Sequence, residues 1–383
     1  MQPGPLPDFI PFNRPALAGN ELAYIARALE AGQISGNGTF TRKCQELLEE
    51  QLGVRRVLLT TSGTHALEMA AFLLNLEPGD EVIVPSFTFV TTALAFVLRG
   101  ARPVFIDVRP DTLNLDESKL ERLVTPRTRA VVPVHYGGVG CEMEKIMEVA
   151  RARSLAVVED NAHGIFGRYR GRHLGSFGEL AALSFHETKN FSCGEGGALL
   201  INNPELIERA EIIREKGTDR SRMFRGEVDR YTWLDLGSSY VPSEILAAFL
   251  FAQLEERERI RASRKRTWDY YYRELSAWAG ESGVRLPCIP PGREQSHHLF
   301  YLILHSCEVR RKLILHLREK NIHSVFHYLP LHLSPMGRRF GGEEGDCPVT
   351  EDVSRRILRL PFYNDIRDTE LRRVIEAIRE FPI

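Results

Sequence analysis

The strongest constraint on the fold is a regular alternation of short apolar strands with helical segments in the first half of the chain. Strands are expected at residues 57–60, 81–84, 103–107, 130–134 and 156–158, and the helices between them at 65–74, 92–98, 118–123 and 142–152. Such connections are right-handed crossovers, which produce a mainly parallel sheet covered by helices. The sequence therefore predicts an α/β fold. Sheets of this class bind ligands beyond the carboxyl ends of their strands.

The pattern changes near residue 236, and this change predicts a second domain. One long helical pattern covers residues 243–260, and a basic and aromatic stretch follows at 261–273. We expect a large domain over residues 1–245 and a smaller C-terminal α+β domain over residues 246–383. The basic run within that stretch, residues 261–266, is expected to form a solvated helix face.

Charge and cysteine usage exclude several classes of protein. Lys and Arg number 50 against 51 Asp and Glu, so no excess of positive charge predicts a nucleic-acid or acidic-membrane partner. The six cysteines form no CxxC pair, which favours reduced thiols over a zinc ribbon or a redox motif. Residues 1–7 contain no basic segment leading into an apolar run, and no run of about 18 apolar residues occurs anywhere. We expect a cytoplasmic protein.

A metal site is not expected either. His323 and His327 stand four residues apart, and His332 follows them, but Pro330 lies within the same segment. The segment is typical of strand and loop rather than helix, so a helical pair of metal ligands is disfavoured.

A lysine segment carries the strongest chemical signal. Lys189 lies in the run 184–190, between an expected strand end and the Gly-rich run 194–197. A lysine fixed in this way can present its amine to a cleft and can be desolvated enough to act as a nucleophile. From this segment alone, a surface lysine beside a flexible loop remains an equal alternative.

Two more polar segments follow expected strands. Asp160 comes just after the strand at 156–158, where a carboxylate can pair with a protonated ring nitrogen of a cofactor. The run 61–66 opens a helix, whose free N–H groups and hydroxyl side chains can hold a phosphate. A turn or helix cap without a ligand remains the alternative for each segment.

In this order, the segments resemble the DegT/DnrJ/StrS family of sugar aminotransferases, which use pyridoxal phosphate on the fold-type I scaffold. The resemblance extends from residues 11–15 to residues 358–364. It implies that Lys189 holds the cofactor covalently and acts as catalytic base and acid, and that Asp160 pairs with the pyridine nitrogen.

The same resemblance assigns further cofactor contacts. Phe89 matches the aromatic residue that stacks on the cofactor ring, although a plain core role stays open. The phosphate-binding positions of the family fall on Gly63, Thr64 and Ser184.

At two positions the sequence departs from the common pattern of the family. His163 stands where many members carry Gln beside the phenolic oxygen of the cofactor, so the protonation of this histidine would matter. Ser239 stands where many relatives place an Asn that reaches the cofactor phosphate of the neighbouring subunit. The resemblance thus implies a homodimer with shared active sites.

Four stretches resemble the dTDP-4-amino-4,6-dideoxygalactose transaminases within this family, at residues 40–42, 132–139, 184–190 and 214–221. They imply transfer of an amino group from L-glutamate to C4 of a dTDP-linked 4-keto-6-deoxyhexose, for surface polysaccharide synthesis. Relatives that dehydrate sugars carry histidine in place of the lysine, so Lys189 favours amination.

Three alternatives to this activity are considered. One is amination of another nucleotide-linked keto sugar, and a second is a non-catalytic regulator that binds the sugar nucleotide or the cofactor. The third, a nicotinamide-dependent oxidoreductase, is disfavoured because no GxGxxG follows the early strands.

Overall fold

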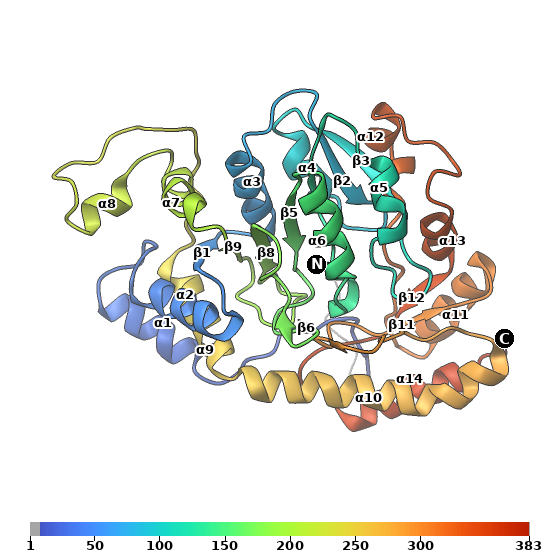
Figure 1. Cartoon of the computed structure of the whole chain (residues 1–383). Helices are drawn as coiled ribbons and strands as arrows, with labels where there is room; N and C mark the ends of the chain where they lie inside the picture. Colours follow the sequence, from blue (N-terminus) through green and yellow to red (C-terminus); the bar gives the residue numbers. More distant parts are fainter. Residues whose placement is uncertain (1–7, 383) are drawn as a thin grey trace.

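A seven-stranded sheet forms the centre of the computed structural model, which describes residues 8–382 (Figure 1). Its spatial order is β1 (Arg56–Thr60), β9 (Gly197–Ile201), β8 (Leu180–Ser184), β5 (Ala156–Asp160), β4 (Thr128–Val131), β2 (Glu81–Pro85) and β3 (Arg102–Ile106). Only β9 runs opposite to the other strands, since it is antiparallel to both β1 and β8. The expected mainly parallel α/β fold is therefore confirmed. Residues 1–7, which entered the argument about a leader, lie outside the described part.

Helices cover both faces of this sheet, and successive apolar side chains of a strand pack against helices on opposite faces. The helices are α3 (Gly63–Leu73), α4 (Thr91–Val97), α5 (Leu120–Leu123), α6 (Met143–Ala152) and α7 (Ile207–Arg214). In β2, Val82 and Val84 pack with residues of α3 and α4, whereas Ile83 packs with residues of α5 and α6. Successive side chains of a strand point to opposite faces, so the helices on each face bury the side chains that point toward them.

A group of three helices, α1 (Glu21–Glu30), α2 (Thr39–Leu52) and α9 (Glu244–Glu255), packs beside β1 and β9. Glu244 is 2% exposed, and its carboxylate accepts hydrogen bonds from the backbone N–H groups of Gly38, Phe40 and Thr41. These donors lie at the start of α2, where N–H groups have no partner within the helix. A carboxylate from α9 thus caps α2.

The long helical pattern at 243–260 is two helices in the structure. Helix α9 ends at Glu255, and α10 (Arg257–Ser282) begins after Glu256, whose φ of −88° and ψ of 18° leave the α-helical region. The prediction of one continuous helix was therefore wrong. The apolar pattern pauses over the charged residues 255–259, but no Pro or Gly marks the junction in the sequence.

The C-terminal part forms a second core around α10 and α14 (Asp368–Arg379), which lie side by side in Figure 1. Its other elements are β11 (Tyr301–Ile303), α11 (Cys307–Glu319), α12 (Pro335–Arg339), α13 (Pro348–Arg356) and β12 (Ile357–Arg359). Ile10, from the other end of the chain, is 1% exposed in this core and pairs with Ile322. The domain boundary after residue 245 remains a prediction.

The remaining α-helix and strands are short. They are α8 (Arg220–Phe224), β6 (Arg168–Tyr169), β7 (Arg172–His173) and β10 (Arg293–Glu294). Strands β10, β6 and β7 form a small separate sheet.

The basic run 261–266 is not simply a solvated face. Arg264 is 2% exposed and donates to the carbonyl oxygens of His297 and His298 at 2.9 and 2.5 Å. Burial lowers the pKa of Arg264 to about 9. Its neighbours Lys265 and Arg266 are exposed, so the expectation fails at one position, where α10 anchors the backbone of His298.

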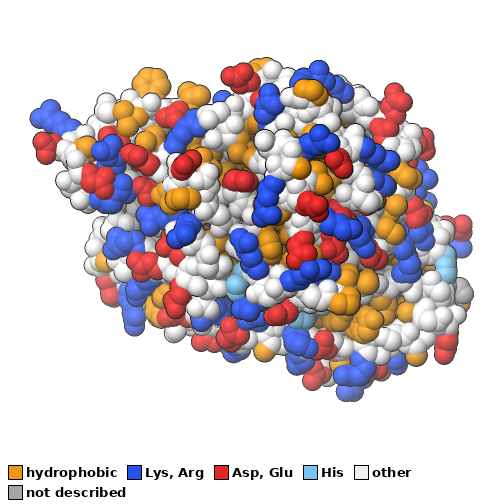
Figure 2. All heavy atoms as spheres, in the orientation of Figure 1, with side chains coloured by type: hydrophobic (Ala, Val, Ile, Leu, Met, Phe, Trp, Pro, Cys, Tyr) orange, Lys and Arg blue, Asp and Glu red, His pale blue; other side chains and the backbone are white. Residues whose placement is uncertain are grey.

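The surface shows no single dominant charge on the face drawn in Figure 2, where acidic and basic side chains are interspersed. Among residues 8–382, no helix combines the length and the apolar character that crossing a bilayer requires.

Candidate active site

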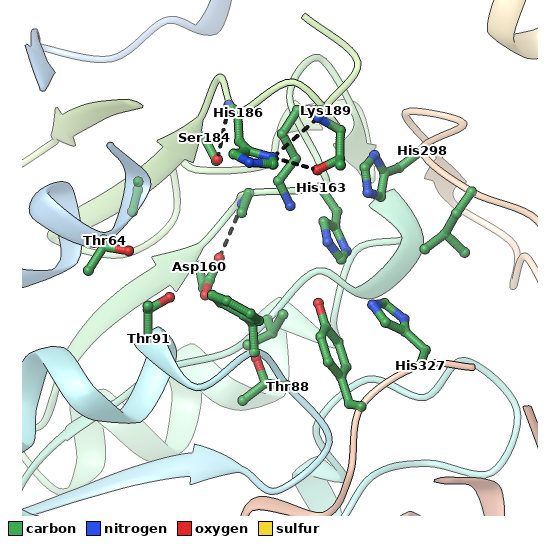
Figure 3. A pocket seen from close by; sticks show the side chains of 18 of the residues that line it. Thr64, Thr88, Thr91, Asp160, His163, Ser184, His186, Lys189, His298 and His327 are labelled. Carbon is green, nitrogen blue, oxygen red and sulfur yellow. Dashed lines mark hydrogen bonds between the residues drawn. The ribbon is translucent and has the colours of Figure 1, made fainter. Parts of the chain in front are cut away.

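A cavity of about 750 Å³ lies beyond the carboxyl ends of β5 and β8 (Figure 3). Asp160 and Ser184, the last residues of these two strands, lie in its wall. The rest of the wall comes from distant segments, including Phe12 near the start of the chain and Arg359 near its end. The cavity thus lies where parallel sheets place their ligands.

Lys189 is held in this wall by a tight turn after β8. Its backbone N–H donates to the carbonyl oxygen of His186 at 2.9 Å, and the side-chain amide of the next residue, Asn190, donates to the carbonyl oxygen of Ser296 at 2.8 Å. Burial lowers the pKa of Lys189 to about 8, with the charge of Arg359 acting in the same direction and that of Asp160 opposing it. The lowered pKa increases the uncharged share of this amine near neutral pH, and the uncharged amine is the nucleophile.

Asp160 faces the same cavity in a fixed orientation. Its Oδ2 accepts a hydrogen bond from Thr92 Oγ1 at 2.7 Å, and its Oδ1 accepts one from the backbone N–H of Ala162 at 3.2 Å. Thr92 Oγ1 also lies 2.8 Å from Thr88 Oγ1, which fixes the hydroxyl. The carboxylate does make a local turn contact, but no helix begins there, and the side chain lines the cavity.

The start of α3 forms an anion cradle at one end of the cavity. Ser62 caps the helix by accepting from the N–H of His65 at 3.1 Å, whereas the N–H groups of Gly63 and Thr64 have no acceptor among residues 8–382. A Cβ at Gly63 would lie 3.0 Å from the Cβ of Ser184, so glycine permits the close approach of helix and strand. The three expected phosphate-binding residues are thus brought together.

His163 is buried, and its hydrogen bonds identify the ring nitrogen that carries the proton. Its Nδ1 accepts from the N–H of Gly137 at 3.4 Å, which leaves the proton on Nε2. Burial, followed by the charge of Lys189, holds its pKa well below the usual value, so the ring is neutral. His163 also stacks on His298, with ring centroids 4.1 Å apart. A neutral N–H donor can replace the amide that many relatives carry here.

The last two expected cofactor contacts differ in position. Phe89 is 56% exposed and lines the cavity, so it is not a core residue and one ring face is available for stacking. Ser239 is exposed, pairs through its backbone with Glu215, and does not line this cavity. Its contact with a neighbouring subunit stays a prediction.

His298, His327 and Arg359 are among the residues of the cavity wall that sequence reasoning missed. His327 was considered only as a metal ligand with His323. The structure separates these two histidines: His327 Nδ1 lies 2.7 Å from the hydroxyl of Tyr136, while His323 packs near Phe12. No local motif marks any of the three, because each enters the cavity through tertiary packing.

The donor set fits pyridoxal phosphate. It contains an amine of lowered pKa, a fixed carboxylate for a ring nitrogen, an N–H donor on His163, and two free N–H groups at a helix start for the phosphate. Lys189 and Asp160 reach the cavity from different elements, as Figure 3 shows.

Comparisons with known proteins identify the family of this chain. The model of the DegT/DnrJ/EryC1/StrS aminotransferase family matches residues 15–379. GDP-perosamine synthase from Caulobacter vibrioides is 34% identical, covering 95% of this chain and 96% of the relative. The aminotransferase TlmJ from Streptoalloteichus hindustanus is 31% identical, with a TM-score of 0.87 and 97% of both chains covered.

A third relative bears on the cofactor. The structure of Spr1654 from Streptococcus pneumoniae in a PMP-form is 25% identical, covers 97% of this chain and 98% of that chain, and has a TM-score of 0.89. PMP is the aminated form of pyridoxal phosphate. This chain therefore belongs to the DegT/DnrJ/EryC1/StrS aminotransferase family and is a sugar aminotransferase that uses pyridoxal phosphate.

Proposed function

We propose that this protein transfers the amino group of L-glutamate to C4 of a nucleotide-linked 4-keto-6-deoxyhexose. The observation that carries the proposal is the convergence of the Lys189 amine and the Asp160 carboxylate on one cavity that also contains the α3 anion cradle. When bound, pyridoxal phosphate supplies an electron sink that stabilises a carbanion at the reacting carbon.

Residues of the chain would carry out proton transfer and would hold the cofactor. Lys189 would take a proton from Cα of the amino donor and later return one to C4 of the sugar, for which its pKa of about 8 is suited. Asp160 would keep the ring nitrogen protonated. Gly63, Thr64 and Ser184 would bind the phosphate, His163 Nε2–H would donate to the phenolic oxygen, and Phe89 would stack on the ring.

The identity of the nucleotide separates two candidate acceptors. The four stretches at 40–42, 132–139, 184–190 and 214–221 favour a dTDP-linked sugar. The relative named GDP-perosamine synthase, similar over nearly its whole length, favours a GDP-linked sugar. Both acceptors keep the ketone at C4, so the chemistry at Lys189 is the same, and the amino sugar would serve surface polysaccharide synthesis.

A direct assay distinguishes these acceptors. Protein loaded with pyridoxal phosphate is first mixed with L-glutamate, and loss of the visible cofactor band reports the donor half-reaction. The aminated enzyme is then given either the dTDP-linked or the GDP-linked 4-keto-6-deoxyhexose, and the product is identified by mass spectrometry and by NMR at C4. We expect amination of one sugar at least tenfold faster than the other. Absence of product with both sugars, despite a complete donor half-reaction, would contradict amination at C4.

We also propose that the protein is a cytoplasmic homodimer with shared active sites. In support, Trp233, Leu234 and Leu236 are 76%, 53% and 54% exposed in the segment that leads to Ser239. Such a patch is typical of a protein interface. A fully active monomer, identified by light scattering at assay concentration, would contradict the shared site.

A further inference from the structure

Arg359 is a cavity residue that the proposed chemistry has not used. It is the last residue of β12, and its backbone pairs with Val325 through N–H···O hydrogen bonds of 2.8 Å from Arg359 and 3.2 Å from Val325. This pairing fixes the start of the side chain, which lies in the cavity wall with Lys189.

The guanidinium of Arg359 is held in place but not neutralised. Its Nη2 donates to the carbonyl oxygen of Phe326 at 3.2 Å, and the guanidinium carbon lies 4.6 Å from the centroid of the Phe12 ring. Its Nε is buried and has no hydrogen-bond partner. Among residues 8–382, no carboxylate lies within 4 Å of this guanidinium. Arg359 is half-buried, and a half-buried cation without a counter-ion is stabilised when a ligand supplies an anion.

The two acidic residues of the described cavity wall contact other groups and not Arg359. Asp160 is bonded to Thr92 and Ala162. The side chain of Glu195 is 67% exposed and lies 3.6 Å from His186. Within the described part of the chain, Lys189 and Arg359 are the lysine and arginine side chains of this wall, and the cavity therefore carries a positive charge that the protein leaves unpaired.

The position of this charge favours a ligand group close to the reacting carbon. Arg359 is near enough to Lys189 for its charge to lower the pKa of that amine. In an amino acid, the α-carboxylate is one bond from the reacting carbon. In a nucleotide-linked hexose, the diphosphate is attached at C1, across the sugar ring from C4, and is therefore remote when C4 is beside Lys189.

We propose that Arg359 binds a carboxylate of the amino donor and so provides the donor subsite of the cavity. A planar carboxylate can accept two parallel N–H hydrogen bonds from a guanidinium, a geometry that a lysine does not reproduce. Glutamate offers two such groups, at the α and γ positions. The inference rests on the proposed function, because it takes an amino acid as the donor.

The test measures the donor half-reaction separately from the sugar half-reaction. In Arg359→Gln loaded with pyridoxal phosphate, we expect the apparent Kd for L-glutamate to rise roughly tenfold to hundredfold. The reaction of the aminated enzyme with the keto sugar is expected to remain within about threefold of wild type. Arg355→Gln is the matched control, because the side chain of Arg355 is 61% exposed on α13, pairs with the exposed Glu344 and does not line the cavity. Arg359→Lys is expected to recover part of the affinity.

L-Glutamine distinguishes the two carboxylates. If Arg359 pairs with the γ-carboxylate, wild type prefers glutamate to glutamine and Arg359→Gln loses the preference. If Arg359 pairs with the α-carboxylate, Arg359→Gln binds both donors more weakly by the same factor. Weakening of the sugar half-reaction alone would place a phosphate at Arg359 and overturn the proposal, as would unchanged glutamate affinity in folded Arg359→Gln.

A binding experiment keeps this inference separate from the proposed function. Glutarate is a dicarboxylate without an amino group, and its binding can be followed by calorimetry on the loaded protein. We expect wild type to bind glutarate and Arg359→Gln to lose at least tenfold in affinity. If Arg359→Gln loses glutarate binding but the wild-type protein aminates neither sugar, only the proposed function is contradicted. If wild type and Arg359→Gln bind glutarate equally, the role of Arg359 is contradicted.

Discussion

Replacement of Lys189 by alanine is expected to lower turnover by at least about 10⁴-fold, because the nucleophile and the proton carrier are lost together. No other lysine lines the described cavity wall, so no neighbouring amine can substitute. Steady-state rates with L-glutamate and the preferred keto sugar measure the effect. Circular dichroism and thermal unfolding check that the fold is kept.

Two controls make the Lys189 result specific. Lys265→Ala removes an exposed lysine that pairs with Asp269 on α10, and it is expected to leave turnover unchanged. A small primary amine added to Lys189→Ala is expected to restore part of the proton transfer, because the truncation leaves space in the cavity. Retention of more than a tenth of wild-type turnover by Lys189→Ala would remove the lysine from the mechanism.

Replacement of Asp160 by asparagine is expected to reduce kcat by about 10²- to 10³-fold, the effect typical of losing one preorganised electrostatic contact. The shape of the side chain is kept, but the negative charge that would stabilise a protonated ring nitrogen is lost. An amide also places a donor near Thr92 Oγ1 or Ala162 N–H, where the carboxylate accepts. Rates of both half-reactions, measured by stopped-flow absorbance, report this change.

The role of Asp160 in catalysis can be separated from a role in folding. Thr92→Val removes the hydrogen bond to Oδ2 while leaving the charge, and we expect it to lose much less activity than Asp160→Asn. Asp269→Asn, on the exposed side of α10, serves as the surface control. A near wild-type kcat in Asp160→Asn would be incompatible with a charge-dependent role.

The first half of the fold was predictable because short strands and crossover helices have different apolar periods. The direction of β9 was not predicted, since antiparallel pairing with β1 and β8 depends on the path of the chain and not on apolar spacing. The break at Glu256 was missed because no Gly or Pro marks the end of α9 in the sequence.

The candidate site was predictable where its residues follow strands. Asp160 ends β5, while Lys189 and Gly63 lie a few residues beyond the ends of β8 and β1, and the carboxyl ends of parallel strands converge. His298 and Arg359 come from the C-terminal part, and their approach to Lys189 depends on how the second core packs against the first. Local sequence carries no signal of that packing, so these residues required the structure.

The pairing of Ile10 with the C-terminal core has a consequence for synthesis of the chain on the ribosome. The N–H of Ile10 donates to the carbonyl oxygen of Asn321 at 2.9 Å, and its carbonyl oxygen accepts from the N–H of His323 at 2.9 Å. Translation adds about 5–20 residues each second, so the nascent Ile10 segment waits on the order of 15–60 s for these partners. The start of the chain is therefore among the last parts to reach its native position, and an apolar segment stays available to chaperones throughout that interval.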